Sequence, residues 1–359
     1  MWSEVSFDAN VNYLCNQVLR LELLRDNSDV DAKLFVLRRI LYQWLSYTFY
    51  LTGVCSDVSL LYLELKFSIL YANLCRRGRL SVIYSKNIAP ALGAEIFGID
   101  LANPLVPNIV QEVRQMFLDR SVLVFRNQIL TPKQQVRFAR YFGSVVPYPF
   151  LKGLECCPEV LEVITRPEDG VNFGGGWHTD TPYLEIPSLG SVLYAKELPP
   201  FGGDTLFSNM YLAYDALDRK TQSFLDGQQA VHSANKRYAK PADRSQIYGQ
   251  IKQAGNKKNI SLENYHPIIR THPETSRKSL FVSSLHTTTI KGMEEKAADT
   301  LLTRLYEHQA SDAFTCRVVW EPDTLVIWDN RCVLHNALFD YAGYKRRMHR
   351  VTIEGDRPT

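Results

Sequence analysis

The hydrophobic pattern of the chain changes near residue 80. Residues 1–79 contain few Gly or Pro residues, and their apolar positions recur at helical spacing, for example at Leu34, Leu37 and Leu41. This spacing gathers apolar side chains on one face of a helix. We therefore expect a helical N-terminal extension over residues 1–79, and its pattern indicates no particular role.

From Leu80 onward, short apolar runs alternate with Gly, Pro and Asp residues, which is typical of β-strands separated by turns. The clearest strand-like runs are residues 121–125, 191–194, 279–282, 324–328 and 351–353. Helical spacing lies between them, at about 108–118, 132–142, 209–226 and 293–309. Many short strands with a few outer helices predict an α+β domain over residues 80–359, built on a double-stranded β-helix (jelly-roll) core with flanking helices.

Two other segments raise separate questions. Residues 240–265 are polar and show no periodicity, which favours a surface insertion or a lid. Residues 41–65 are apolar enough to suggest a membrane anchor, but polar residues such as Gln43, Asp57 and Glu64 interrupt them. A membrane span needs about 20 nearly uniform apolar residues. A span is therefore not expected, although an anchored protein remains the alternative.

Composition narrows the class of protein. The 41 basic and 38 acidic residues leave a net charge of +3, which argues against a nucleic-acid partner. The seven cysteines form no C-x-x-C pair, so we expect reduced thiols in a cytoplasmic protein. The first ten residues also lack the basic stretch and apolar run of a signal peptide.

Candidate metal ligands follow a glycine run, where His178 and Asp180 are separated by one residue. On a strand, such residues point to the same side and can reach one metal ion. A single His-x-Asp is weak evidence, because His272-Pro273-Glu274 shows that similar triplets occur by chance. A metal site at these two residues therefore needs further ligands, and the C-terminal segment contains candidates.

That segment supplies a second histidine and two arginines. His335 lies 157 residues after His178 (335 − 178), and Arg346 and Arg350 follow it. If residues 345–353 form a strand, both arginines share one face. Two arginines inside a β-fold are costly unless an anion meets them, and the guanidinium fork suits a carboxylate. The alternative is a surface strand with solvated arginines.

Two imidazoles and one carboxylate on one side of a metal leave three positions open, as in non-haem iron(II) oxygenases. A chelating 2-oxo acid would take two of these positions and dioxygen the third. Zinc remains an alternative ion, but it would normally take water as its fourth ligand and would give the paired arginines no role.

These residues and the stretches around them resemble those of a known enzyme family. From about Leu80 to its end, the chain resembles the taurine dioxygenase (TauD/TfdA) family of Fe(II)/2-oxoglutarate-dependent dioxygenases. The matching stretches occur in order: LGAEIFGIDL (92–101), VLVFRNQ (122–128), FARYFG (138–143), WHTD (177–180), AKELPPFGGDTLF (195–207), HPIIRTHPETSRKSLFV (266–282), WDNRCVLH (328–335) and DYAGYKRRMHRVTIEGDRP (340–358).

The resemblance implies roles for individual residues. His178, Asp180 and His335 fall on the iron ligands of the family. Thr205 falls on the hydroxyl that contacts 2-oxoglutarate, and Arg346 on the arginine that pairs with its distal carboxylate. The implied reaction uses Fe(II), 2-oxoglutarate and O2, releases succinate and CO2, and hydroxylates a substrate because a carboxylate ligand is present.

The resemblance also implies an anionic small-molecule substrate. Arg350 matches an arginine that faces the sulfonate in taurine dioxygenase, while Tyr148, Leu151 and His286 stand where that enzyme has other residues. We therefore expect Arg350, Tyr148 and His286 to contact a sulfonate, a sulfate ester or a carboxylate other than taurine. The alternative is a catalytically silent jelly-roll protein that binds a metal or a small carboxylate. Self-association into a homo-oligomer stays open.

Overall fold

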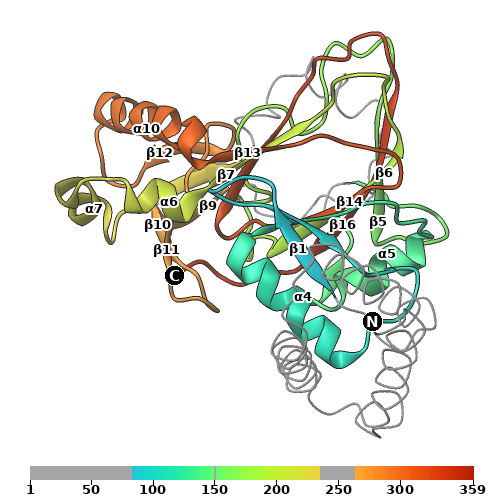
Figure 1. Cartoon of the computed structure of the whole chain (residues 1–359). Helices are drawn as coiled ribbons and strands as arrows, with labels where there is room; N and C mark the ends of the chain where they lie inside the picture. Colours follow the sequence, from blue (N-terminus) through green and yellow to red (C-terminus); the bar gives the residue numbers. More distant parts are fainter. Residues whose placement is uncertain (1–82, 149–150, 235–262) are drawn as a thin grey trace, which may run out of the picture. The chain divides into compact units, whose positions relative to one another are not determined.

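The computed structural model describes residues 83–148, 151–234 and 263–359, and Figure 1 shows how their elements are arranged. The extension predicted over residues 1–79 and the apolar stretch at 41–65 lie outside these residues. Most of the insertion predicted at 240–265 does so too, and its last residues, from Glu263, belong to a β-strand. No helix in the three described ranges is long and apolar enough to cross a membrane.

The helices agree with the expected positions, with one difference. They are α4 (Pro107–Arg120), α5 (Pro132–Ala139), α6 (Met210–Asp215), α7 (Arg219–Leu225), α10 (Glu295–Gln309) and the 3₁₀ turn η2 (Asp312–Phe314). The single helix expected over 209–226 is two helices. Asp218 separates them, because its side chain accepts hydrogen bonds from the backbone N–H groups of Lys220 and Thr221 and so starts a new helix.

Each run expected from the sequence overlaps a strand, although Phe281 and Val282 of the run at 279–282 lie beyond the end of its strand. In chain order they are β1 (Tyr84–Asn87), β2 (Ala94–Phe97), β3 (Val122–Phe125), β4 (Val145–Val146), β5 (Val160–Thr165), β6 (Gly190–Glu197), β7 (Thr205–Asn209), β8 (Gln229–Ser233), β9 (Glu263–Pro267), β10 (Ile269–Thr271), β11 (Lys278–Leu280), β12 (Thr287–Ile290), β13 (Thr315–Val318), β14 (Leu325–Asp329), β15 (Val333–Ala337) and β16 (Arg346–Ile353).

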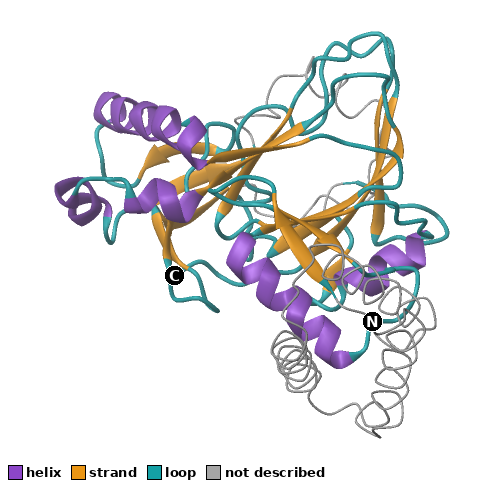
Figure 2. Ribbon diagram, in the orientation of Figure 1, coloured by secondary structure: helices purple, strands orange, loops and turns teal. Residues whose placement is uncertain are grey.

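Four sheets are built from these strands, and they are largely antiparallel (Figure 2). The main sheet has the order β1-β2-β3-β14-β6-β16-β4, with β5 also paired to β16. A smaller sheet has the order β13-β7-β15. The remaining sheets are β12-β8-β9 and β10-β11. This is a mixed α/β architecture in which sheet pairing, not helix packing, organises the domain.

Alternation along the strands explains the layers. On β3, Leu123 and Phe125 pack with apolar residues of α4 and α5, such as Phe117 and Phe138. Val122 and Val124 of the same strand pack in a second cluster, which includes residues of β7, β13 and β15. Because both faces of β3 are covered, its sequence is a continuous apolar run without polar alternation. The candidate site lies on the side of the main sheet that faces the β13-β7-β15 sheet.

Candidate metal centre and co-substrate cavity

Three buried side chains converge at one point. Nε2 of His178 lies 3.9 Å from Oδ1 of Asp180, and Nε2 of His335 lies 3.7 Å from the same oxygen. The two imidazole centroids are 4.1 Å apart. These ligand atoms all lie within 4.8 Å of one another and could hold one metal ion. The sequence therefore identified three residues that the fold brings together.

Backbone pairing brings the two histidines together. His178 and His335 form an isolated antiparallel bridge, in which each N–H donates to the carbonyl of the other, at 3.0 and 2.8 Å. His335 belongs to strand β15, whereas His178 lies in an extended loop. The expectation that His178 and Asp180 lie on a strand is thus wrong in detail. The loop is nevertheless extended enough that both side chains reach the same point.

Asn330 anchors the loop that carries His178 and Asp180. Its side-chain oxygen accepts from the backbone N–H of Asp180 at 3.3 Å, and its carbonyl accepts from the hydroxyl of Thr179 at 2.7 Å. The same side-chain oxygen also accepts from Nε1 of Trp328 at 2.9 Å. The turn before His335 therefore anchors the segment that carries the other two candidate ligands.

The protonation states fit a divalent cation. Nδ1 of His178 lies 2.8 Å from the carbonyl of Gly176, so a neutral ring that donates its N–H to this carbonyl presents the lone pair of Nε2 to a metal. Burial lowers the pKa of His335 to about 4, although Asp180 opposes this shift. Burial raises the pKa of Asp180, but Arg350, the two histidines and a hydrogen bond from Ser191 outweigh it and hold the pKa far below its usual range. The set thus offers two imidazoles and one carboxylate, the donors that iron(II) accepts.

A buried cavity adjoins the three residues. Its polar lining includes Thr205, Arg346 and Arg350 together with the two histidines. The apolar lining consists of Val163, Phe173, Leu193, Trp328, Ala337 and Met348. Arginines enclosed by apolar walls are costly unless an anion compensates their charge.

The predicted face of strand β16 is correct. Arg346, Met348 and Arg350 all line the cavity, while Arg347 points the other way and forms ion pairs with Glu162 and Glu197. Arg346 and Arg350 are each 5% exposed. The alternative of a surface strand with solvated arginines is therefore wrong for these two positions.

Arg346 presents unused donors. Its Nε and Nη2 are buried and have no hydrogen-bond partner in the part of the chain that the structure describes. Burial lowers its pKa, and Tyr341 and Asp204 only partly offset this. Gly203 lies against its side chain, because a Cβ on this glycine would sit 3.2 Å from Cδ and Nε of Arg346. Two adjacent unmet N–H groups match the two oxygens of a carboxylate.

Thr205 lies at the start of strand β7 and lines the same cavity. Nε1 of Trp320 donates to its hydroxyl oxygen at 3.0 Å, which orients the hydroxyl. The indole of Trp320 also lies 5.7 Å from the guanidinium carbon of Arg346. Trp320 was not singled out from the sequence, because nothing in its local pattern distinguishes it from a core tryptophan.

Arg350 has a partner that the sequence did not indicate. Its Nη2 lies 2.9 Å from Oδ2 of Asp180 and donates to the hydroxyl of Ser191 at 3.1 Å. Its guanidinium carbon lies 5.0 Å from the centre of the Tyr148 ring. Arg350 thus connects a candidate metal ligand to the residues around a neighbouring hollow.

That neighbouring hollow contains the other two residues predicted to contact substrate. Tyr148 and His286 line it together with His178, Asp180, Phe173 and Leu285. The His286 ring lies 5.9 Å from that of His178 and 5.2 Å from that of Tyr183, and the hydroxyls of Tyr148 and Tyr183 are 3.4 Å apart. The fold therefore gathers all eight predicted site residues. Phe173 and Leu285 line this space as well, although the sequence contained no signal for them.

A second buried cluster, formed by His272, Asp329 and Cys332, does not suit a metal. Both oxygens of Asp329 accept hydrogen bonds from Arg331, at 2.8 and 2.7 Å, and His272 lies 3.1 Å from the second oxygen. Arg331 also reaches Glu274 at 2.7 Å. The carboxylate is thus already neutralised by a guanidinium. The expectation that His272 does not bind metal agrees with this arrangement.

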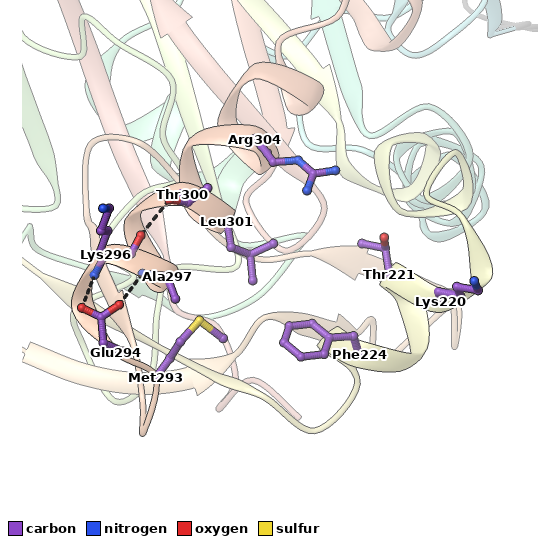
Figure 3. A pocket seen from close by; sticks show the side chains of 10 residues that line it. All are labelled: Lys220, Thr221, Phe224, Met293, Glu294, Lys296, Ala297, Thr300, Leu301 and Arg304. Atoms are coloured by element: carbon purple, nitrogen blue, oxygen red, sulfur yellow. Dashed lines mark hydrogen bonds between the residues drawn. The ribbon is translucent and has the colours of Figure 1, made fainter.

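Another hollow lies in a groove between helices α7 and α10 (Figure 3). Phe224, Met293 and Leu301 form its apolar floor, and Lys220, Lys296 and Arg304 are its cations. The groove shares no residue with the metal centre. Among the described residues that line it, Glu294 is the one acid, and its carboxylate accepts from the backbone N–H groups of Lys296 and Ala297 at the start of α10.

Comparison with known proteins agrees with this geometry. The family described as taurine catabolism dioxygenase TauD, TfdA family matches residues 85–352. An alpha-ketoglutarate-dependent sulfonate dioxygenase of Saccharomyces cerevisiae is 31% identical over 301 residues, which cover 80% of this chain and 71% of the yeast protein. An alpha-ketoglutarate-dependent 2,4-dichlorophenoxyacetate dioxygenase of Cupriavidus pinatubonensis is 32% identical over 291 residues, covering 76% of this chain and 98% of the relative.

A solved structure gives the same result in three dimensions. The crystal structure of a putative alpha-ketoglutarate-dependent taurine dioxygenase from Burkholderia xenovorans is similar to this chain with a TM-score of 0.66 and 31% identity, covering 77% of this chain and 94% of that one. The family match over residues 85–352 spans both segments that carry the candidate ligands. The chain belongs to the TauD/TfdA family of 2-oxoglutarate-dependent dioxygenases.

Proposed function

We propose that this protein hydroxylates a small anionic organic compound in a reaction that uses Fe(II), 2-oxoglutarate and O2 and releases succinate and CO2. His178, Asp180 and His335 would hold the iron. Thr205 and Arg346 would bind 2-oxoglutarate, while Arg350, Tyr148 and His286 would contact the substrate. One oxygen atom of O2 enters the substrate as a hydroxyl, and the other enters the new carboxylate of succinate.

The observation that carries this proposal is the position of the unmet Arg346 donors in the cavity that contains both histidines. A dicarboxylate there could place one end at Arg346 and the other at the metal ligands. When bound, iron(II) supplies the redox chemistry that couples decarboxylation of the 2-oxo acid to oxidation of a substrate C–H bond.

The chain itself contributes binding, orientation and exclusion of water. Asp180 and the two histidines are at most 5% exposed, so water has little access to the reacting atoms. Trp320 orients the Thr205 hydroxyl, and Asn330 holds the backbone of Asp180. Such fixed contacts keep the bound molecules close to their reacting geometry.

The anionic substrate class rests on Arg350. Its Nε is buried without a hydrogen-bond partner among the residues in the three described ranges, while Nη2 is taken by Asp180 and Ser191. The guanidinium therefore retains a donor for a substrate anion. The yeast and Cupriavidus relatives are named for a sulfonate and a carboxylate respectively, and both are anions. We propose a sulfonate, a sulfate ester or a carboxylate for this chain.

A succinate-release screen with Fe(II) and ascorbate tests the proposal. Alkyl sulfonates, alkyl sulfate esters and aryloxyacetates would be compared, with Asp180→Ala as the matched inactive control. We expect at least one class to raise succinate formation well above the rate without substrate, and the control to form none. A wild-type protein that binds metal and 2-oxoglutarate but forms no succinate with any class would favour a catalytically silent binding protein.

Four further predictions belong with this proposal. A helical extension over residues 1–79, an insertion or lid at 240–265 and a cytoplasmic location stay predictions, as does assembly into a homo-oligomer. Size-exclusion chromatography with light scattering would determine the oligomeric state. A variant that begins at Leu80 would show whether the first 79 residues contribute to activity.

A further inference from the structure

Ser191 lies against the candidate iron ligand Asp180. Its hydroxyl donates to Oδ2 of Asp180 at 2.8 Å. The other oxygen, Oδ1, is the one that faces the Nε2 atoms of His178 and His335. The two oxygens of this carboxylate therefore have different surroundings, one aimed at the metal position and one held by the protein.

We propose that Ser191 is a positioning residue of the iron centre, whose hydroxyl fixes Oδ2 of Asp180 so that the carboxylate presents only Oδ1 to the metal. The inference rests on the proposed function, because it takes Asp180 as an iron ligand. A carboxylate that binds through one oxygen leaves three positions open, whereas one that binds through two leaves fewer. The orientation of Asp180 thus decides whether both 2-oxoglutarate and O2 have room.

The strand makes Ser191 a rigid anchor. Ser191 is fully buried near the start of β6, where its backbone pairs with Trp328 of β14 and with Thr352 of β16. A serine side chain has a single rotatable bond before its oxygen, so a fixed backbone fixes the hydroxyl closely. Side chains held in this way by packing and pairing give a site its preorganised geometry.

Arg350 is the second partner of Oδ2, at 2.9 Å, but it differs from Ser191 in two respects. Its long side chain has more conformational freedom, and its charge is proposed to meet the substrate anion. The Ser191 hydroxyl also accepts from Nη2 of Arg350 at 3.1 Å, so it connects the two charged groups.

Metal titration tests this inference without turnover. The affinity for Mn(II) would be measured by electron paramagnetic resonance, and the coordination of Co(II) by its d–d absorption, in wild type, Ser191→Ala and Ser191→Thr. Loss of a group that orients a metal ligand typically weakens metal affinity by about 10- to 100-fold. We expect Ser191→Ala to show a weakening of about 10-fold with altered Co(II) bands, and Ser191→Thr to restore both because it keeps the hydroxyl.

Ser208→Ala is the matched control. Ser208 is also fully buried on a strand, but its hydroxyl donates to the carbonyl of Gln309, away from the candidate metal ligands. It should bind metal as wild type does. If Ser191→Ala fails to fold by circular dichroism, Ser191→Cys replaces it, since a thiol is similar in size and a weak donor.

Wild-type Mn(II) affinity and Co(II) bands in a folded Ser191→Ala or Ser191→Cys protein would overturn the inference. A merely structural role predicts lower thermal stability with unchanged metal spectra, so that result also counts against positioning. Failure of the proposed function looks different. In that case wild type forms no succinate, while the effect of Ser191 on metal affinity can still be measured.

Discussion

Replacing Arg346 by methionine should separate binding of 2-oxoglutarate from stability of the fold. The substitution keeps an apolar side chain against Gly203 and Trp320 but removes the guanidinium. Arg346 is 5% exposed, and its Nε and Nη2 meet no hydrogen-bond partner in the residues placed by the structure. The charge is thus held in the fold at a cost and is available for a ligand.

The expected loss of affinity follows from these two donors. Truncating one partner of a buried, hydrogen-bonded charge pair costs about 2–5 kcal/mol. Since about 1.4 kcal/mol corresponds to a factor of 10, the dissociation constant for 2-oxoglutarate should rise roughly 30-fold to several thousand-fold. The ligand-free variant should be as stable as wild type or more stable, because the desolvation cost of the buried guanidinium outweighs its favourable contacts with Tyr341 and Asp204.

Thermal unfolding with Mn(II), with and without 2-oxoglutarate, measures both effects. A ligand at 100 times its dissociation constant stabilises the native state by about 2.7 kcal/mol, so wild type should show a clear rise in Tm. Arg346→Met should show almost none at the same concentration. Arg347→Met is the matched control, because Arg347 lies next in the strand but faces away, toward Glu162 and Glu197. Equal stabilisation of wild type and Arg346→Met by 2-oxoglutarate would refute the reasoning.

Three other outcomes are expected. Asp180→Ala should abolish succinate formation and weaken metal binding, while circular dichroism shows a retained fold; an active variant would remove Asp180 from the metal centre. Arg350→Ala should lose stimulation by the anionic substrate yet keep slow decarboxylation of 2-oxoglutarate, so an unchanged KM for substrate would count against the assigned contact. Burial and the nearby His266 lower the pKa of His232 well below its usual range, so below pH about 6.5 the unfolded chain binds a proton that the folded chain does not. The free energy of unfolding should therefore fall by up to about 1.4 kcal/mol per pH unit between pH 6.5 and 5, measured by urea denaturation, and His232→Gln should reduce this slope.

Much of the fold was predictable because its signals are local. The runs at 121–125 and 324–328 became the paired central strands β3 and β14, since apolar, β-branched residues suit a strand covered on both faces. The helix expected over 209–226 failed for a reason that periodicity does not show. Asp218 keeps the helical spacing of its neighbours, but its side chain caps a new helix.

Some residues of the candidate site could be predicted from the sequence, but the contacts between them could not. His178, Asp180, His335 and Arg346 could be found because they occur in ordered motifs of a family. Contacts between motifs could not be found in this way. The contact of Arg350 with Ser191 depends on how β16 lies beside β6. The contacts of both residues with Asp180 depend on where the loop that carries Asp180 lies relative to these strands.

The sequence by itself determined the donor set, the alternation that places Arg346 and Arg350 on one face of β16, and membership of the family. These properties depend on residue type and short spacing, which the chain carries before it folds. Only the tertiary structure decided which oxygen of Asp180 faces the histidines and which is held by Ser191 and Arg350. It also decided that Arg346 remains without partners for two of its donors. Hydrogen bonds between segments far apart in the chain depend on strand register and burial, and neither is encoded in the spacing of any one motif.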